Sequence, residues 1–257
     1  MKSFRSYPAE TTIHGDLYRF EKILKEDFFS VNVLYRNEQG AGYVLKLSDF
    51  RFIFGWLCRP LAGWMSRREY RTYQRLSDVP GIPQLGPRYG WRGFYHSFIE
   101  GKTLHELKGG GILPDNFFDQ LNTIMTEVHR RRVFYLDSNK CGNIILSDEG
   151  TVYLIDFQIC ITFPPLTTWL GRRLDRLFNR LTQEDIYHVY KHKNYFQPHL
   201  MTEEERPLAQ RSSLNQTYHR SLLQVYLKLK RPIYPHGSNE IIWYKWKKMK
   251  NKEPQTP

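Results

Sequence analysis

The chain has 257 residues, of which 40% are hydrophobic and 15% aromatic, with 38 Lys and Arg against 26 Asp and Glu. This composition excludes a disordered chain, and the length allows one large domain or two lobes. The three Cys residues are widely spaced and form no CxxC pair, which excludes a disulfide framework and a zinc site. The net charge of +12 indicates an anionic partner: lipid, nucleic acid or a phosphorylated small molecule.

The first third of the chain is rich in predicted strands. Residues 17–25, 30–36 and 42–48 carry aromatic and β-branched residues in partial alternation, and residues 93–101 are again strand-like. Helical spacing appears at 66–77, whereas the Pro- and Gly-rich segment 79–91 is expected to be a loop. Residues 102–110 are expected to form a short helix that ends at the Gly run.

The remainder is predicted to be mainly helical. Residues 115–131 have apolar side chains on one face of a helix. A hairpin is expected next, with strands at 143–147 and 151–157 joined by Asp148-Glu149-Gly150. From Trp169 to the end the sequence is basic and expected to be helical. The fold class predicted is α+β, with two lobes.

One stretch combines the groups that phosphoryl transfer needs. Asp137, Lys140 and Asn143 follow the predicted helix 115–131, and Asp156 ends the predicted hairpin. A carboxylate can orient an attacking hydroxyl, a lysine can neutralise phosphate charge, and an amide oxygen and a second carboxylate can hold Mg²⁺. The hairpin should bring Asn143 and Asp156 to the same end of two paired strands.

With these motifs the sequence resembles the protein-kinase-like superfamily over residues 17–195, most closely its bacterial atypical branch of lipopolysaccharide-core (Kdo and heptose) kinases. The resemblance implies a small antiparallel five-stranded sheet lobe with one helix (the αC helix of kinases) at residues 1–98 and a mainly helical lobe at 99–257. It also implies ATP-binding residues: Lys46, Glu69, Ser97, Phe98, Ile99 and Ile145. Asp137 and Lys140 would be catalytic, Asn143 and Asp156 would bind metal, and Asp185 would brace the catalytic loop.

Four departures from the family pattern accompany this resemblance. The segment KEDFFS at 25–30 stands where a glycine-rich loop is usual, and Gln158 replaces the Gly after Asp-Phe. Tyr135-Leu136 replaces the usual His-Arg before Asp137. Six positions instead of five separate Asp137 from Asn143, which predicts a displaced Lys140.

The function that the resemblance implies is ATP- and Mg²⁺-dependent transfer of the γ-phosphoryl group to a hydroxyl. We expect the acceptor to be a sugar of a lipopolysaccharide-core or other glycolipid. A serine/threonine protein kinase is the first alternative, and a non-catalytic pseudokinase binding module is the second. No APE-like motif follows Asp156, and the segment 161–173 is short and broken by Pro, unlike a docking platform for protein substrates.

The first twelve residues lack the apolar core of a signal peptide, so we expect a cytoplasmic protein. Two regions are candidates for peripheral contact with the anionic inner face of the cytoplasmic membrane. The aromatic segment 52–64 is either a buried helix or an interfacial patch. Residues 241–252 hold five Lys and three aromatic residues, and are either a solvated tail, a membrane anchor or, third in order, a nucleic-acid contact.

Several other polar residues are expected to have structural roles. His14-Gly15-Asp16 should be a turn, His129 a packed histidine and Cys141 a small packed residue. The cluster of Tyr187, His188, His192 and Lys193 is expected to lie on a solvated basic helix face, with substrate contact as the alternative.

Overall fold

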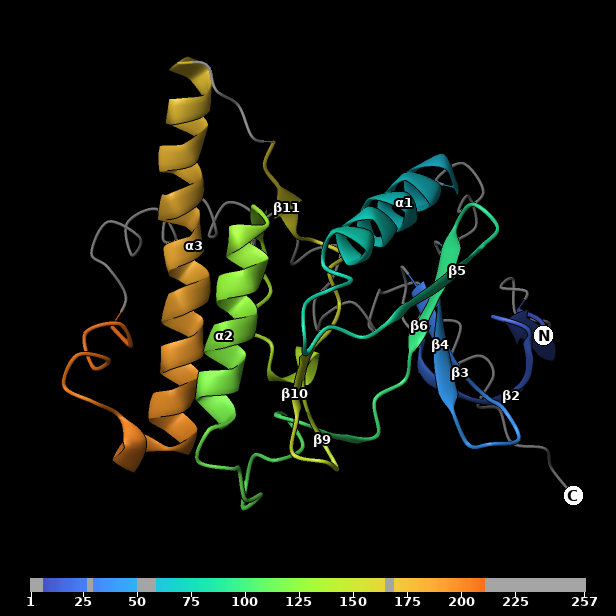
Figure 1. Cartoon of the computed structure of the whole chain (residues 1–257), viewed down its shortest axis with the longest axis horizontal. Coiled ribbons are helices and arrows are strands. Elements are labelled where there is room, and N and C mark those ends of the chain that lie inside the picture. Colours follow the sequence, from blue (N-terminus) through green and yellow to red (C-terminus); the bar gives the residue numbers. More distant parts are fainter. Residues whose placement is uncertain (1–6, 27–29, 50–58, 165–168, 211–257) are drawn as a thin grey trace, which may run out of the picture.

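The computed structural model describes residues 7–26, 30–49, 59–164 and 169–210. Its largest element is a six-stranded antiparallel sheet in the order β1-β2-β3-β4-β6-β5 (Figure 1). The strands are β1 (Glu10–Ile13), β2 (Asp16–Glu26), β3 (Ser30–Arg36), β4 (Gly42–Ser48), β5 (Leu85–Tyr89) and β6 (Gly93–Ser97). The α+β class is confirmed.

The sheet has one strand more than the five expected. The additional strand β1 pairs with β2 through the turn at His14-Gly15, as predicted for that motif, where both residues have positive φ. The segment 79–91 was expected to be a loop, but it contains β5. Its Pro and Gly residues do not prevent pairing, because β5 is an edge strand with an irregular register to β6.

Alternation along β4 decides which side chains face the helices. Tyr43, Leu45 and Leu47 join one hydrophobic cluster with Ile13, Val31 and Tyr95 on one face of the sheet. Lys46 lies between Leu45 and Leu47, so its side chain leaves from the opposite face, toward α1.

Helix α1 (Arg59–Arg75) begins seven residues before the predicted helix at 66–77. Pro60 is compatible with this earlier start, because a first helical turn has no intrahelical partner for its N–H groups. The buried residues are Ala62, Gly63, Ser66, Glu69, Thr72 and Tyr73, one stripe of a helix. The preceding part of the aromatic segment 52–64, up to residue 58, lies outside the described residues.

The predicted short helix at 102–110 is wrong. Residues 101–103 form strand β7 (Gly101–Thr103), and turns follow to residue 110. Thr103 and Glu106 exchange hydrogen bonds as at a helix start (2.7 and 3.2 Å), but Gly109 and Gly110 follow with positive φ, so no regular helix continues.

Helix α2 (Phe117–Arg130) and the predicted hairpin are confirmed. Strand β9 (Ile144–Ser147) lies between β10 (Val152–Leu154) and β7, and Gly150 turns the hairpin with φ 83°. Strand β8 (Val133–Phe134) pairs with β11 (Ile161–Thr162). A single 3₁₀ turn, η2 (Cys141–Asn143), connects the loop after β8 to β9.

Helix α3 (Trp169–Phe196) is 28 residues long and packs beside α2 (Figure 1). It is followed by η3 (Pro198–Leu200). The basic segment 241–252 lies outside the described residues, and among the helices described none is long and apolar enough to cross a bilayer.

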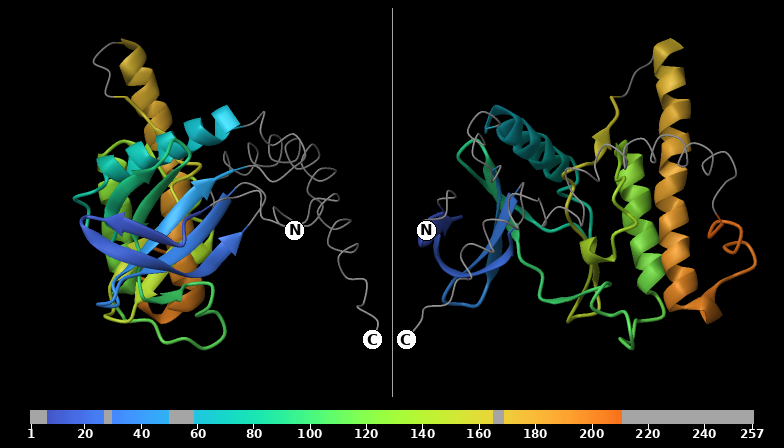
Figure 2. Two further views of the ribbon diagram at one scale, coloured as in Figure 1. Left: turned by 90° about the vertical axis from the view of Figure 1, so that its right-hand side faces the viewer. Right: turned by 180° about the vertical axis from the view of Figure 1, so that it is seen from behind.

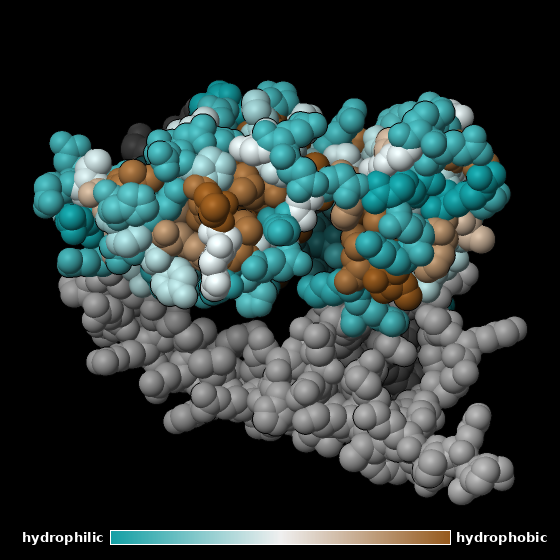
Figure 3. Space-filling view, turned by 90° about the horizontal axis from the view of Figure 1, so that it is seen from below, coloured by the Kyte–Doolittle hydropathy of each residue, from teal (hydrophilic) through white to brown (hydrophobic). Residues whose placement is uncertain are grey.

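The main hydrophobic core extends across the predicted boundary at residue 98. Tyr73, Leu76 and Phe94 from the sheet half belong to the same buried cluster as Phe117 of α2 and Phe157. The right-hand view of Figure 2 shows the sheet half and the helical half side by side, and Figure 3 shows the surface hollowed between them.

A second link between the halves is the loop after α1. The Gly81 carbonyl accepts a hydrogen bond from the Leu154 N–H (2.8 Å). Gly81 has φ 86°, and a Cβ there would lie 2.3 Å from Ile124 of α2, so glycine is required both by conformation and by space. This loop therefore fixes the end of α1 to the helical half.

Candidate active site

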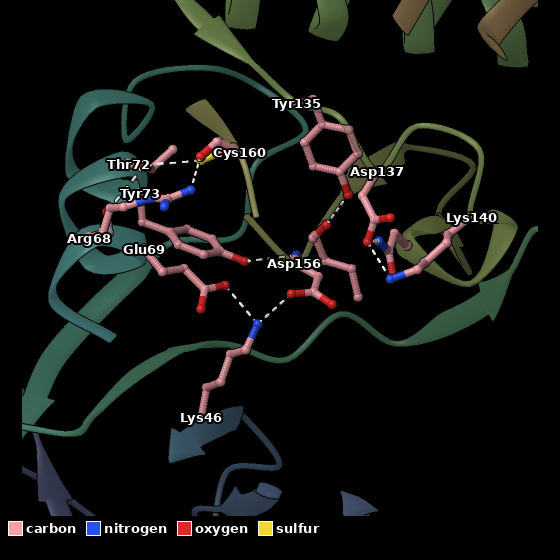
Figure 4. Close-up of polar contacts among 12 residues, drawn as sticks. Lys46, Arg68, Glu69, Thr72, Tyr73, Tyr135, Asp137, Lys140, Asp156 and Cys160 are labelled. Carbon is pink, nitrogen blue, oxygen red and sulfur yellow. Dashed lines mark hydrogen bonds and ion pairs between the residues drawn. The ribbon is translucent and has the colours of Figure 1, made fainter. Parts of the chain in front are cut away.

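Lys46 joins three parts of the chain at the junction between the halves. Its Nζ donates to Glu69 Oε1 on α1 (2.7 Å) and to Asp156 Oδ1 after β10 (2.5 Å) (Figure 4). The side chains of Lys46 and Glu69 are almost completely buried, whereas that of Asp156 is 21% exposed. The sequence prediction that these three residues share a site agrees with this geometry.

Burial and charge oppose each other in this cluster. Burial favours a neutral lysine, but the carboxylates of Asp156 and Glu69 outweigh it and raise the pKa of Lys46. Burial raises the pKa of Asp156 as well, but Lys46 outweighs that effect and lowers it to about 2. For Glu69 burial prevails over the attraction of Lys46, and its pKa is raised to about 7. At neutral pH, Lys46 and Asp156 are therefore a charged pair.

The backbone of Asp156 adopts the left-handed conformation, with φ 65°. This is unusual for a residue other than glycine and is maintained by neighbouring contacts. The Asp156 N–H donates to the Tyr73 hydroxyl (3.4 Å), and the buried Phe157 packs edge-on against Tyr73 and Tyr135. These contacts turn the Asp156 carboxylate toward Lys46.

A second cluster lies on the loop after β8. Lys140 Nζ and Asn143 Nδ2 both donate to Asp137 Oδ2, at 2.5 and 3.1 Å. The extra residue in this loop was expected to displace Lys140, but the lysine still reaches the carboxylate. Its side chain remains 60% exposed, in contrast to the buried Lys46.

Asp185 on α3 holds this loop through three hydrogen bonds and contacts α2 through a fourth. It is completely buried and accepts from the Tyr135 N–H (2.9 Å), the Leu136 N–H (3.1 Å) and the Ser138 hydroxyl (2.8 Å). His129 Nε2 lies 3.0 Å from the same carboxylate, so the expected packed histidine is confirmed. Leu136 has a left-handed backbone, with φ 68°, and the hydrogen bonds from Tyr135 and Ser138 to Asp185 hold the chain before and after it.

The expectation of a solvated basic face on residues 187–193 is wrong for two of its members. Lys193 is buried and forms an ion pair with Glu205 (2.7 Å). His192 is buried, with its Nε2 3.1 Å from the Ser138 carbonyl and its Nδ1 3.6 Å from Cys141 Sγ. His192 faces the loop after β8 and Lys193 faces the segment after η3, so both side chains are covered.

Burial lowers the pKa of His192 to about 4, so its ring is neutral at neutral pH. The Ser138 carbonyl can only accept, which assigns the ring proton to Nε2 and leaves Nδ1 to accept from the Cys141 thiol. Cys141 is buried, and the expectation of a packed residue is confirmed.

The segment after β6 was expected to meet adenine through Ser97, Phe98 and Ile99. The Ser97 N–H donates to the Gln84 carbonyl (2.8 Å) and the Phe98 N–H to the Gly42 carbonyl (2.9 Å). Within the described residues the Ile99 N–H has no hydrogen-bond acceptor. Of these three N–H groups it is therefore the one that could donate to a nucleotide base. Ile145, half-buried on β9, points away from the core that its neighbour Ile144 joins.

Asn143 and Asp156 fit a magnesium ion held jointly with phosphate oxygens. The Ile155 N–H donates to the Asn143 carbonyl (3.0 Å), so the two side chains leave the same end of the β9–β10 hairpin. An amide oxygen and an ionised carboxylate are hard ligands, and Mg²⁺ often takes one or two protein ligands plus phosphates. Among the described residues no group of three or more His, Cys, Asp or Glu forms a metal cage.

A group of residues that sequence reasoning missed attaches α1 to the chain after Asp156. Arg68 donates to the Cys160 carbonyl, and the Thr72 hydroxyl lies 3.4 Å from Cys160 Sγ (Figure 4). Arg68 directly precedes Glu69 and Thr72 lies about one turn after it, so these contacts hold the Glu69 carboxylate toward Lys46. Neither Thr72 nor Cys160 has a sequence neighbourhood that signals this contact.

Comparison of the chain with protein-family models and with curated protein sequences gives no match.

Proposed function

We propose that the chain is a two-lobed, kinase-like enzyme that transfers the γ-phosphoryl group of ATP to an alcohol. The observation that carries the proposal is the charged cluster of Lys46, Glu69 and Asp156 beside the loop cluster centred on Asp137. The first cluster is built to hold anionic phosphates, and the second to hold a hydroxyl. Fold alone does not decide activity, so the argument depends on these side chains.

In this proposal Asp137 orients the acceptor hydroxyl and takes its proton. The hydroxyl oxygen forms a bond to the γ-phosphorus as the bond from that phosphorus to the β,γ-bridging oxygen breaks, and ADP leaves. Lys46 neutralises charge on the α- and β-phosphates. Lys140 neutralises charge on the transferred group, for which its exposed amine is suitably placed beside Asp137. Mg²⁺, when bound by Asn143 and Asp156, would add positive charge at the phosphates.

The acceptor that we propose is a hydroxyl of a glycolipid sugar such as a lipopolysaccharide-core sugar, reached from the cytoplasmic side of the membrane. Support comes from the short chain between Asp156 and α3, which begins at Trp169. That interval leaves little length for a platform that would bind a protein substrate. A protein serine or threonine is the alternative acceptor.

The test is phosphotransfer from labelled ATP with Mg²⁺ to lipopolysaccharide-core glycolipids and, in parallel, to a mixture of proteins. We expect labelled glycolipid with the wild type and a loss of about 10³-fold with Asp137→Ala. If protein were labelled in place of glycolipid, the acceptor would be a protein hydroxyl, and the proposed phosphotransfer reaction would stand.

A non-catalytic binding module makes a different prediction. In that case neither acceptor would be labelled, Asp137→Ala would behave like the wild type, and ATP with Mg²⁺ would leave the thermal unfolding temperature unchanged. The Asp156→Ala variant should abolish any stabilisation by ATP with Mg²⁺ if the catalytic proposal holds.

A further inference from the structure

Helix α1 has two faces of different chemistry. Its buried face carries Glu69, the partner of Lys46. Its outer face carries Leu61, Trp64, Arg67 and Arg71, all exposed.

Within the residues that the structure describes, no carboxylate compensates the charge of the outer face. Arg59, Arg67 and Arg71 form no ion pair with any residue in the described part of the chain. Glu69 is the only acidic residue of α1, and it is buried on the opposite face with Lys46. A row of arginines on a helix without neighbouring carboxylates favours an anionic partner.

Large apolar side chains lie next to these arginines. Trp64 is 56% exposed and Leu61 49%, and Arg68 stacks over the Trp64 ring at 5.3 Å. Trp91, 46% exposed, lies at the edge of this face, because its ring packs on Gly63, one turn before Arg67, where a Cβ would lie 2.1 Å from the ring. The surface formed by Leu61, Trp64, Arg67, Arg71 and Trp91 is called the α1 face below.

We propose that the α1 face docks on the surface of an anionic lipid bilayer. Tryptophan prefers the headgroup level, and arginines beside it bind lipid phosphates. Nucleic acid would use the arginines but would gain little from an exposed leucine. Residues 211–257 are a poor occupant, because they hold ten Lys and Arg against two Glu and carry the same sign of charge.

The proposal goes beyond the proposed function, since docking requires no phosphotransfer. It also has a consequence for the site, because the helix that docks is the one that carries Glu69. A bilayer on the outer face would restrict the helix whose inner face aligns Lys46.

Binding of the full chain to sedimented vesicles tests the charge of the α1 face. The wild type should bind vesicles with 30% phosphatidylglycerol and not pure phosphatidylcholine. The double variant Arg67→Glu with Arg71→Glu should weaken binding to these vesicles at least 30-fold. Each arginine contributes about 1 kcal/mol to binding at an anionic surface, and about 1.4 kcal/mol corresponds to a tenfold change in affinity. The matched control is Arg176→Glu with Arg180→Glu, which places the same charge change at the same spacing on the exposed side of α3 and should bind like the wild type. Equal binding by both double variants, or equal loss, would overturn the proposal.

Tryptophan fluorescence tests the apolar part. Brominated lipids should quench the emission of the wild type, and Trp64→Phe with Trp91→Phe should lose a large share of that quenching. Absence of any quenching difference would mean that the α1 face does not meet lipid, for example because another segment of this chain covers it. Tighter binding to single-stranded RNA than to vesicles, lost in the Arg67 and Arg71 variant, would assign the face to nucleic acid and overturn the proposal as well.

Discussion

Two lysines meet carboxylates at this site, but their environments differ. The side chain of Lys46 is 5% exposed and contacts two carboxylates, whereas that of Lys140 is 60% exposed and contacts one. Loss of Lys46 would leave two largely buried carboxylates without their cation, whereas loss of Lys140 would leave Asp137 with its hydrogen bond from Asn143. Lys46 is therefore part of the fold and, in the proposed mechanism, also binds phosphate, whereas the exposed amine of Lys140 is open to a substrate.

Lys46→Met should destabilise the protein by about 3 to 5 kcal/mol, because Glu69 and Asp156 are left facing each other without a cation. Phosphotransfer should fall by about 10³-fold. Urea unfolding measures the first effect and labelled ATP the second. Lys22→Met on the exposed side of β2 is the control and should change stability by less than about 0.5 kcal/mol. If Lys46→Met were as stable as this control, the contrast between the two lysines would be wrong.

Asp185→Ala should cost about 3 kcal/mol, since it leaves the buried N–H groups of Tyr135 and Leu136 without an acceptor. Amide hydrogen exchange at these two residues should accelerate well beyond that at α2. Ser138→Ala removes one donor but leaves the others bonded to Asp185, so it should cost only about 1 kcal/mol. A larger cost for Ser138→Ala than for Asp185→Ala would contradict the brace described above.

Acid should destabilise the protein through His192. Its pKa is about 4 in the folded chain and 6.5 in the reference state, so between these values the unfolded chain binds a proton that the folded chain does not. Stability should therefore be complete above pH 6.5 and decline as the pH falls toward 4, by about 1 to 3 kcal/mol from this residue. The measurement is the free energy of unfolding against pH for the wild type and His192→Gln. The two curves should converge at low pH, and parallel curves would exclude His192 as the source.

Lys140→Met should change stability by less than about 1 kcal/mol, because the lysine is exposed and the largely buried Asp137 keeps its hydrogen bond from Asn143. Phosphotransfer should nevertheless fall by about 10²-fold, since the charge on the transferred group loses its partner. The combination of a small change in urea unfolding and a large change in rate is the signature that distinguishes Lys140 from Lys46. A loss of stability equal to that of Lys46→Met would remove the distinction.

The local parts of this architecture could be predicted from the sequence. Contacts between residues close in the chain determine the hairpin around Gly150 and the helix that ends at Arg130. The same holds for the polar loop residues Asp137, Lys140 and Asn143. Their spacing therefore carries the information. The helix predicted at 66–77 begins too late because Leu61 and Trp64 are exposed, which disturbs the expected amphipathic pattern. The alternative of a buried helix over 52–64 agrees with α1 from residue 59 on, but not with the exposure of these two side chains.

The long-range contacts could not be predicted in the same way. The contact between Thr72 and Cys160 spans 88 positions, and that between His192 and Ser138 spans 54. Such pairs depend on how α1 and α3 rotate about their axes when they pack, and a single sequence does not fix that rotation. His192 was assigned to solvent for this reason. Asp185 was found only through a resemblance to a family, not through its surroundings in the sequence.

The hydrophobic cluster shared by Tyr73, Phe94 and Phe157 has a consequence for folding cooperativity. Both halves of the molecule complete this one core, so neither can lose its structure without exposing apolar surface of the other. Calorimetry should show a single transition rather than two, and a fragment that ends at residue 98 should fail to fold alone because its share of the core would face water. The two halves thus carry different chemical groups, but they should unfold together as one cooperative unit.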